Sequence, residues 1–202
     1  MKTKHIIKLM AHFDHYFGQN DAMVARTPEG NGAKVDIMIY KPNEQYPYWK
    51  LVTIGASDYR MPGFSHGLGN RNEYIMFIDP NEDMHDLKQF SWYRDRLLEL
   101  VNYTVDNREF ISCGHSIEWE EEPGEEMVGA YIEMPQIIPD PAVLRCRLAP
   151  FRRATCLQVI MINQTELDLL LQIGSDKFSL LLYPESGENR HFISQRRRSA
   201  SF

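Results

Sequence analysis

The chain has 202 residues and a formal net charge of −6, from 22 Lys and Arg against 28 Asp and Glu. Its 43% hydrophobic and 25% charged residues are typical of a globular protein, and its negative charge argues against an extended nucleic-acid surface. No apolar run is long enough to span a membrane, and three cysteines without paired spacing indicate neither a disulfide framework nor a zinc ribbon. We therefore expect one cytoplasmic domain over residues 1–202, with no nucleic-acid partner and no cofactor.

The first part of the chain contains a helix pattern followed by three strand patterns. Apolar residues recur at helical spacing from Ile6, and Gly18 is placed to end this helix. Residues 35–40 and 48–55 are rich in β-branched and aromatic residues, which predicts neighbouring strands or a hairpin. The nearly continuous apolar run at 73–80 predicts a central strand.

The rest of the chain adds a long helix, a hairpin, and a last strand that leads into a short helix. Asp83 or Asp86 is placed to cap the long helix, and Thr165 with Asp168 has the spacing of a capping box for the short one. The hairpin is expected at 110–119 and 127–135, the last strand at 154–163, and the short helix at 164–173. Strands grouped between helices predict an α/β (α+β) fold, in which helices pack on a mixed β-sheet.

The segment 51–62, LVTIGASDYRMP, begins as a strand and becomes polar after Gly55. Ser57 and Asp58 could supply a nucleophile and a carboxylate, but the segment lacks the glycine elbow that exposes a catalytic serine in many hydrolases. Ser and Asp side chains readily bond nearby amides in turns. We therefore interpret these two residues as capping a turn, and Met61 as a residue that packs or contacts a partner.

Two residue pairs leave an enzymatic alternative open, either hydrolase-like or metal-dependent. Cys113 and His115 lie two apart in an extended segment and would form a thiolate–imidazole pair only if the backbone kinks at Gly114. His12 and His15 lie three apart on the first helix and could share a metal, although a third ligand would have to come from elsewhere. We favour a buried cysteine, a satisfied histidine at 115, and two polar positions beside an apolar helix stripe.

The order of these segments resembles the suppressor of fused family in its bacterial, single-domain form. Residues 36–42 fit D-I-x-x-x-x-P, residues 47–61 fit P-Y-x-x-L-V-T-x-G-x-S-D-x-x-M, and a strand, a helix and a glycine-histidine segment follow. The resemblance is strongest over residues 35–182. The matching positions are Asp36, Ile37, Pro42, Pro47, Tyr48, Leu51, Val52, Thr53, Gly55, Ser57, Asp58, Met61, Gly114 and His115.

This resemblance implies a suppressor-of-fused-like fold and a non-enzymatic protein-binding module. Many bacterial members look like immunity proteins for polymorphic toxins, which implies a toxin domain or another basic protein as the partner. Exposed aromatic and acidic residues would then carry the contact, because aromatic groups bury area and acidic groups steer a basic partner. The contact residues that we expect are Tyr46, Ser57, Asp58, Tyr59, Met61, His115 and Glu121. Residues 190–202, with three consecutive arginines, are expected to form a loose basic tail.

Overall fold

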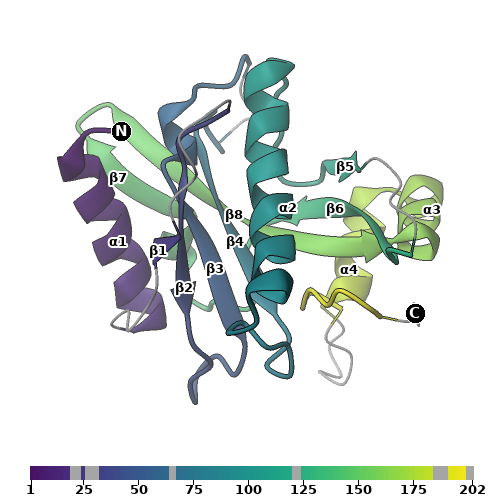
Figure 1. Cartoon of the computed structure of the whole chain (residues 1–202). Helices are drawn as coiled ribbons and strands as arrows, with labels where there is room; N and C mark the ends of the chain where they lie inside the picture. The colour runs from purple at the N-terminus through teal and green to yellow at the C-terminus, as the bar shows by residue number, and fades with distance from the viewer. Residues whose placement is uncertain (19–23, 26–31, 64–66, 120–123, 184–190, 199–202) are drawn as a thin grey trace.

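A computed structural model describes residues 1–18, 24–25, 32–63, 67–119, 124–183 and 191–198 of the chain. In this part of the chain, eight strands form one mixed sheet with helices on both faces (Figure 1). The strands are β1 (Val24–Ala25), β2 (Asp36–Tyr40), β3 (Trp49–Ile54), β4 (Asn72–Ile78), β5 (Ser116–Glu118), β6 (Met127–Glu133), β7 (Arg145–Ala149) and β8 (Arg152–Asn163). The helices are α1 (Thr3–Phe17), α2 (Leu87–Asp106), α3 (Gln164–Ile173) and α4 (Ser175–Leu182), with 3-10 turns η1 (Ala56–Asp58) and η2 (Pro141–Leu144).

The strand order across the sheet is β1-β2-β3-β4-β8-β6-β5, and β7 pairs with the first part of β8. The pair β4 and β8 is parallel, whereas the other paired strands run antiparallel. This architecture confirms the predicted α+β fold, the β2–β3 hairpin and the central position of β4. It also contains β7 and α4, which the sequence patterns did not predict, and the strand expected at 110–119 is reduced to β5.

Strand β4 is apolar from Tyr74 to Ile78 because both faces of the sheet are covered along these residues. Its side chains alternate, so that Ile75 and Phe77 enter one hydrophobic core while Tyr74, Met76 and Ile78 enter the other. The first core lies under α1, α3 and α4, and the second lies under α2. A strand buried on both faces has no polar side to show, which explains the continuous run in the sequence.

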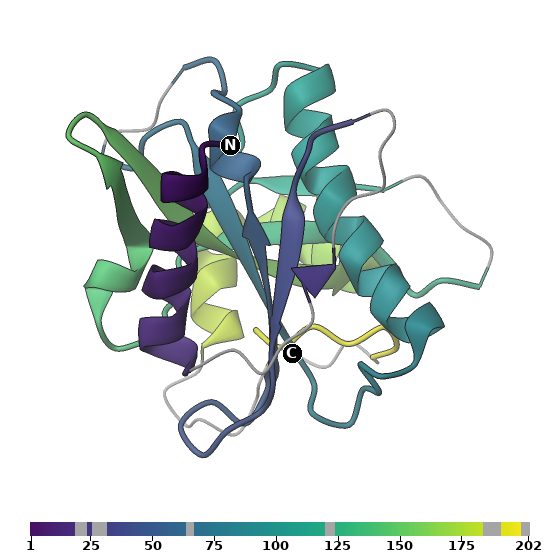
Figure 2. The same ribbon diagram turned by 60° about the vertical axis from the view of Figure 1, so that its left-hand side comes forward.

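Helix α1 lies on the first core beside the hairpin of β7 and β8, as Figure 2 shows. Its buried residues Leu9, Phe13 and Phe17 follow the predicted helical spacing, and Gly18 ends the helix as expected. The helix is also tied to β7 at its polar edge, where Lys8 Nζ donates a hydrogen bond to the carbonyl oxygen of Leu148 at 2.9 Å. The N-terminal helix therefore supports one side of the hairpin.

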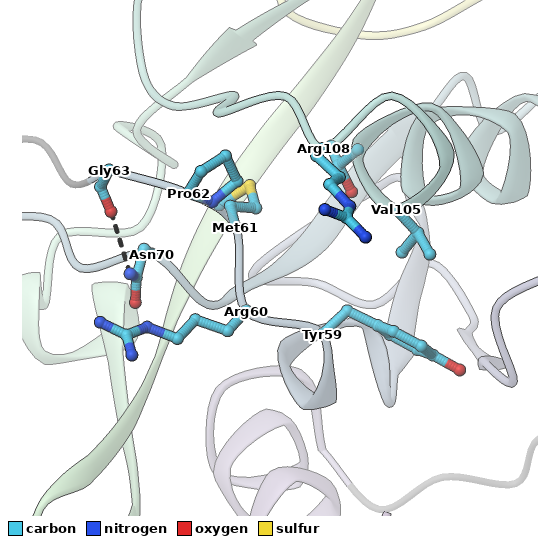
Figure 3. Close-up of a pocket in the computed structure, with 9 residues that line it drawn as sticks. Tyr59, Arg60, Met61, Pro62, Gly63, Asn70, Val105 and Arg108 are labelled. Atoms are coloured by element: carbon cyan, nitrogen blue, oxygen red, sulfur yellow. Dashed lines mark hydrogen bonds between the residues drawn. The ribbon is translucent and has the colours of Figure 1, made fainter.

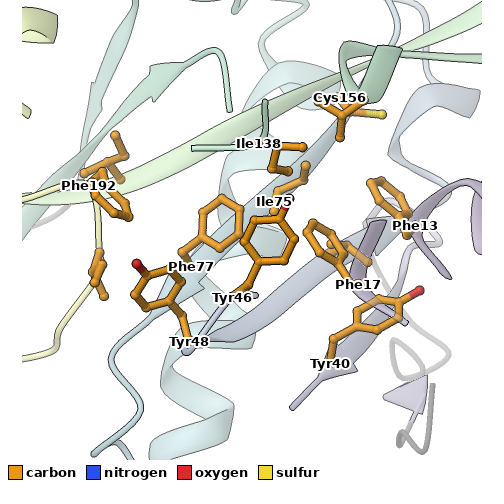
Figure 4. Close-up of a cluster of buried hydrophobic side chains, with 14 of the residues drawn as sticks. Phe13, Phe17, Tyr40, Tyr46, Tyr48, Ile75, Phe77, Ile138, Cys156 and Phe192 are labelled. Atoms are coloured by element: carbon orange, nitrogen blue, oxygen red, sulfur yellow. The ribbon is translucent and has the colours of Figure 1, made fainter. Parts of the chain in front are cut away.

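Tyr46, expected at the surface, belongs to an aromatic cluster of the first core (Figure 4). Its side chain is 4% exposed, and its ring meets that of Phe17 edge-on at 5.9 Å between centroids. Phe17 also contacts Tyr40 and Phe77. The prediction of Tyr46 as an exposed contact residue is therefore wrong in this structure, because a side chain buried in this core has almost no surface left for a partner.

Helix α2 covers the second core and begins at the predicted cap. The Asp86 carboxylate accepts hydrogen bonds from the backbone N–H groups of Lys88, at 2.7 Å, and Gln89. Leu87, the first residue of the helix, is 78% exposed, since the face turned to the sheet begins at Phe90. The buried residues of the helix are Phe90, Tyr93, Arg96, Leu97, Leu100, Val101 and Thr104.

Helix α3 begins with a capping box, but not at the predicted residues. The Asn163 side chain accepts from the N–H of Glu166 at 3.0 Å, and the Glu166 carboxylate accepts from the N–H of Asn163 at the same distance. The prediction of Thr165 and Asp168 placed this box two residues too late. Asn163 lies directly at the end of β8, so the chain turns there and the helix starts at once.

The predicted loose tail at 190–202 is packed in its described part, residues 191–198. Ser194 forms a parallel bridge with Ile78 at the end of β4. Arg198 Nη2 lies 2.6 Å from Oε1 of the fully buried Glu166, and the same guanidinium donates to backbone carbonyl oxygens. The expectation of a solvated tail is therefore wrong for these residues, because Arg198 is buried in an ion pair with a carboxylate on α3. Across the described ranges, no helix combines the length and apolarity needed to cross a membrane.

Candidate functional site

The turn that follows β3 depends on a glycine. Gly55 has a φ of 124°, and a Cβ atom there would lie 2.9 Å from the carbonyl oxygen of Lys34. Only glycine adopts this conformation without strain at so close an approach. The chain therefore leaves the sheet abruptly at Gly55 and enters η1, and Tyr59 and Arg60 directly follow this turn.

A buried carboxylate organises this turn. Glu73 on β4 is 0% exposed and accepts hydrogen bonds from the hydroxyl groups of Thr53 and Ser57, each at 2.7 Å. It also accepts from the backbone N–H groups of Gly55 and Ser57 at 3.0 Å, and of Ala56 at 3.2 Å. Burial raises the pKa of the Glu73 carboxyl, and these hydrogen bonds oppose that rise. The network fixes the backbone from β3 into η1.

The network also decides the roles of the two polar residues predicted as turn caps. Ser57 is fully buried and donates a hydrogen bond from its hydroxyl group to Glu73, so it holds the turn as predicted. A buried side chain cannot also serve as the contact residue that we expected. Asp58 accepts a short hydrogen bond from Arg152 and lies 2.9 Å from the Met1 ammonium group. Partial burial opposes ionisation of Asp58, but hydrogen bonds from these two cations lower its pKa. Neither residue is a free nucleophile or base.

Two arginines from other elements complete the support of the turn. Arg71 Nη1 donates to the carbonyl oxygens of Ser57 at 3.0 Å and of Asp58 at 2.8 Å. Arg152, the first residue of β8, donates to the Ser57 carbonyl oxygen at 3.3 Å in addition to its ion pair. The carbonyl groups that point out of η1 are thus satisfied by guanidinium groups, and the turn is rigid at its outer side.

Two pockets lie beside this turn and share Arg60 and Asn70 in their walls. The first, of about 450 Å³, lies between the segment after η1 and the end of α2, where Arg108 and Val105 lie opposite Met61 (Figure 3). The buried Met61 therefore packs into the floor of this pocket. The first pocket is lined by Tyr59, Arg60, Met61, Pro62, Gly63, Asn70, Thr104, Val105 and Arg108.

The second pocket, of about 590 Å³, lies between the same segment and the tip of the β7–β8 hairpin. Phe151 at this tip is fully exposed and is the most exposed large apolar side chain among the described residues. We call the surface formed by both pockets the arginine surface. It is defined by Arg60, Arg71, Arg108, Phe151, Arg152 and Arg153.

This surface was not predicted from the sequence. Its residues come from four separated parts of the chain, near 60, 71, 108 and 152, so no local motif contains them. A partial signal was present in residues 145–153, RCRLAPFRR, where arginines surround a Pro-Phe turn. Of the expected contact residues, the half-exposed Tyr59 does lie on the first pocket, and its hydroxyl accepts a hydrogen bond from the N–H of Lys34 at 2.7 Å.

The Cys113–His115 pair does not form. Gly114 has a φ of 86° and does kink the backbone, but the Cys113 thiol donates to Glu133 at 3.0 Å. Burial, and then the neighbouring Glu133, raise the pKa of Cys113 to about 12, whereas a nucleophilic cysteine needs a lowered pKa. His115 is exposed, and its ring lies edge-on to that of Phe110 at 6.0 Å.

His12 and His15 of α1 contact different groups and do not form a shared site. His12 Nε2 lies 2.9 Å from the carbonyl oxygen of Val143, and burial lowers the pKa of this histidine. His15 is exposed and contacts the ring of Tyr16. In the described ranges, no group of three or more His, Cys, Asp or Glu side chains is placed to hold a metal ion. The structure thus gives this pair packing and hydrogen-bonding roles.

The acidic segment expected to attract a basic partner is partly engaged within the chain. Glu125 forms a short ion pair with Arg196, and Glu126 accepts from the N–H of Arg198 at 3.0 Å. Glu121 lies outside the described residues. The structure therefore gives the contact role of Glu121 no geometric support, and the unpaired cations of the arginine surface define a different candidate.

Comparisons with known proteins give one family and one fold. The family model of the suppressor of fused protein (SUFU) matches residues 31–198. The fold is similar to that in the crystal structure of the Sufu–Fu complex, with a TM-score of 0.70, 14% identity, and coverage of 98% of this chain and 91% of that chain. No curated protein shows a significant match.

Two further solved structures share the fold. A suppressor of fused homologue from Neisseria gonorrhoeae FA 1090 has a TM-score of 0.68 and 14% identity, and the match covers 98% of this chain and 97% of that chain. Drosophila Suppressor of Fused has the same TM-score and identity, and the match covers 96% of this chain. This chain spans 50% of the length of the Drosophila protein.

Proposed function

The chain belongs to the suppressor of fused family, and from this premise we propose that it acts by binding another protein and not by catalysing a reaction. The observation that carries the proposal is the Glu73 network. It engages the Ser57 hydroxyl and three backbone N–H groups, so that the segment with the strongest family resemblance holds no free reactive group. The same network holds Tyr59 and Arg60 at the rim of two pockets.

A rigid surface of this kind suits recognition of a folded partner. Association costs free energy when side chains or loops must become ordered. A turn held by buried hydrogen bonds is ordered before the partner binds, so it avoids this cost. Exposed aromatic and arginine side chains are also the residues that most often carry binding free energy at protein interfaces. Phe151 and Arg60 supply both kinds at the arginine surface.

The finer form of the proposal is neutralisation of a toxin in the cytoplasm, with the chain acting as an immunity protein that covers the toxin's functional surface. Its support is the resemblance to bacterial single-domain members of the family. The Sufu–Fu complex gives an example of a similar fold engaged with another protein. No catalytic residue, cofactor or metal is part of this proposal.

The test is a capture experiment with a functional readout. The tagged chain is used to isolate partners from native lysate, and the protein identified is then expressed with and without the chain in a susceptible host. We expect a stable one-to-one or higher complex on gel filtration and relief of growth inhibition. A partner that remains inhibitory within the complex would contradict neutralisation. Turnover that is lost in Cys113→Ser or His115→Ala, in folded protein, would contradict the non-enzymatic role.

A further inference from the structure

The arginine surface has the opposite charge to the chain as a whole. Its two pockets are lined by five arginines, and none of the described lining residues is acidic. The whole chain carries a net charge of −6, so these cations stand out from their surroundings. A concave region of one sign raises the local concentration of oppositely charged groups and speeds their encounter.

The five arginines divide into two groups. Arg71 and Arg152 hold the turn by the hydrogen bonds given above, and their guanidinium groups are already engaged. Arg60, Arg108 and Arg153 are exposed and make no side-chain hydrogen bond or ion pair with a described residue. Each of these three guanidinium groups offers several N–H donors in a fixed plane that matches a carboxylate.

Arg108 occupies a backbone position that disfavours it. It follows the last residues of α2 with a φ of 54°, the single positive value at a residue other than glycine in the described part of the chain. Glycine is the usual residue at such a helix end, and another side chain there costs about 1 kcal/mol. An unfavourable backbone conformation that is kept at a pocket wall points to a use for the side chain.

The remaining lining distinguishes between classes of anion. Met61, Pro62 and Val105 form an apolar floor in the first pocket, and Phe151 projects beside the second. Apolar walls beside cations match a peptide in which carboxylate side chains are attached through aliphatic groups or lie next to apolar residues. A nucleic acid would need a long basic track for its evenly spaced phosphates, and the net negative charge of the chain opposes such a polyanion.

We infer that the arginine surface binds an acidic segment of the protein partner, with carboxylate groups on Arg60, Arg108 and Arg153 and an apolar side chain near Phe151. This inference rests on the proposed binding function and reverses the charge expected for the partner, since the sequence analysis predicted a basic protein. The two pockets share Arg60, so one extended segment can occupy both.

A peptide measurement tests this recognition without the natural partner. The probe is fluorescein-labelled Ser-Glu-Glu-Leu-Asp-Glu-Leu-Ser, compared with the same peptide carrying Gln and Asn in place of Glu and Asp. We expect fluorescence anisotropy to show binding of the acidic probe alone, weakened at least about ten-fold by Arg60→Glu and also by raised salt. Binding of neither probe, or equal binding of both, would overturn the inference.

Arg108→Gly gives a sharper variant, because relief of the backbone conformation and loss of the side chain act in opposite directions. We expect its unfolding midpoint to equal or exceed that of the wild type while its affinity for the acidic probe falls about five-fold. The matched control is Lys177→Glu, a charge reversal at an exposed position of α4, with affinity within about two-fold of the wild type. Equal losses for Arg60→Glu and Lys177→Glu would show a net-charge effect and overturn a specific site.

Two further experiments test the inference: binding of an oligonucleotide, and capture of the natural partner by arginine variants. A labelled single-stranded oligonucleotide that binds more tightly than the acidic peptide, through the same arginines, would assign the surface to nucleic acid and overturn the inference. A natural partner retained equally by the wild type and by Arg60→Glu/Arg153→Glu would overturn it as well, while the proposed binding function would stand. A wild-type chain that retains no partner would contradict the proposed function alone, because the peptide result is independent of it.

Discussion

Two fully buried glutamates hold distant regions of this protein by different means. Glu73 accepts hydrogen bonds from neutral hydroxyl and amide groups of the turn after β3, whereas Glu166 pairs with the Arg198 guanidinium from the C-terminal segment. The first carboxylate orders a short stretch close to it on the neighbouring strand. The Glu166 carboxylate holds the C-terminal segment through Arg198, which lies 32 positions later in the sequence. Neutral hydrogen-bond donors around Glu73 thus order one local turn, whereas the Glu166–Arg198 ion pair attaches the C-terminal segment to α3.

The largest expected effect comes from removing the carboxylate with neutral partners. Glu73→Ala leaves two hydroxyl groups and three N–H groups without an acceptor, most of them buried, and we expect the free energy of unfolding to fall by about 4 kcal/mol. Urea denaturation followed by circular dichroism measures this change. Glu118→Ala, at an exposed position of β5, is the control and should change stability by less than about 0.5 kcal/mol. A loss for Glu73→Ala as small as that of the control would show that the network is not required.

The ion pair should respond differently. Arg198→Met leaves Glu166 buried without its cation, and we expect a loss of about 3 kcal/mol in the same measurement. Adding Glu166→Gln removes the unpaired charge and should recover part of that loss, giving a favourable coupling in the double-mutant cycle. Additive losses would mean that the two side chains act independently and that the comparison with Glu73 fails.

Lys50 on β3 extends the comparison to a buried cation with neutral partners. Its Nζ donates to the carbonyl oxygens of Lys41 and Tyr46, and burial lowers its pKa from 10.5 to about 8. The unfolded chain therefore binds more protons between about pH 8 and 10.5, so this group makes the protein more stable as pH rises through that window.

The size of the Lys50 effect is about 3 kcal/mol, and it should be absent in Lys50→Met. The quantity to measure is the difference in unfolding free energy between the two proteins at each pH, because thiol and phenol groups also titrate in alkaline solution. Cys146, for example, has its pKa raised to about 11 by burial and contributes in the opposite direction. A pH-independent difference would show that the ammonium group is not desolvated in the folded chain.

The smallest effect is expected at the partly exposed ion pair of Glu125 and Arg196. The hydrogen bond from Arg196 lowers the pKa of Glu125, so the stabilisation is present at neutral pH and is lost as acid protonates this carboxylate. Glu125→Gln should cost less than about 1 kcal/mol, and about 0.5 M salt should reduce that cost further. A salt-insensitive loss as large as that of Arg198→Met would place this pair with the buried interactions.

Features that depend on neighbouring residues were predictable from the sequence. The apolar run of β4, the Asp86 cap of α2 and the glycine end of α1 each follow from the local rules of strands and helices. Strand β7 was missed although its alternation of arginines with apolar residues is a strand pattern, because it is only five residues long and lies between Pro141 and Pro150. Helix α4 was missed because Gly174, which ends α3, also begins the next helix.

The candidate site was predictable only in part. The motif around Ser57 indicated a capped turn, but its acceptor is Glu73, sixteen residues further along on the neighbouring strand. The arginine surface requires the parallel pairing of β4 with β8, which brings Arg71 and Arg152 to the same end of the sheet. No local pattern specifies that pairing, and the burial of Tyr46 depends equally on the distant α1.

Strand β8 has a consequence for how quickly a partner can be recognised. Its twelve residues pair with β4 on one edge and with β7 and β6 in succession on the other, and Arg152 stands at its first position. A partner protein that approaches this end of the sheet therefore meets a preformed surface, anchored to a strand that is paired on both edges. This surface needs no rearrangement before the partner binds. Encounter frequency and orientation, more than any slow conformational step, should then set the association rate.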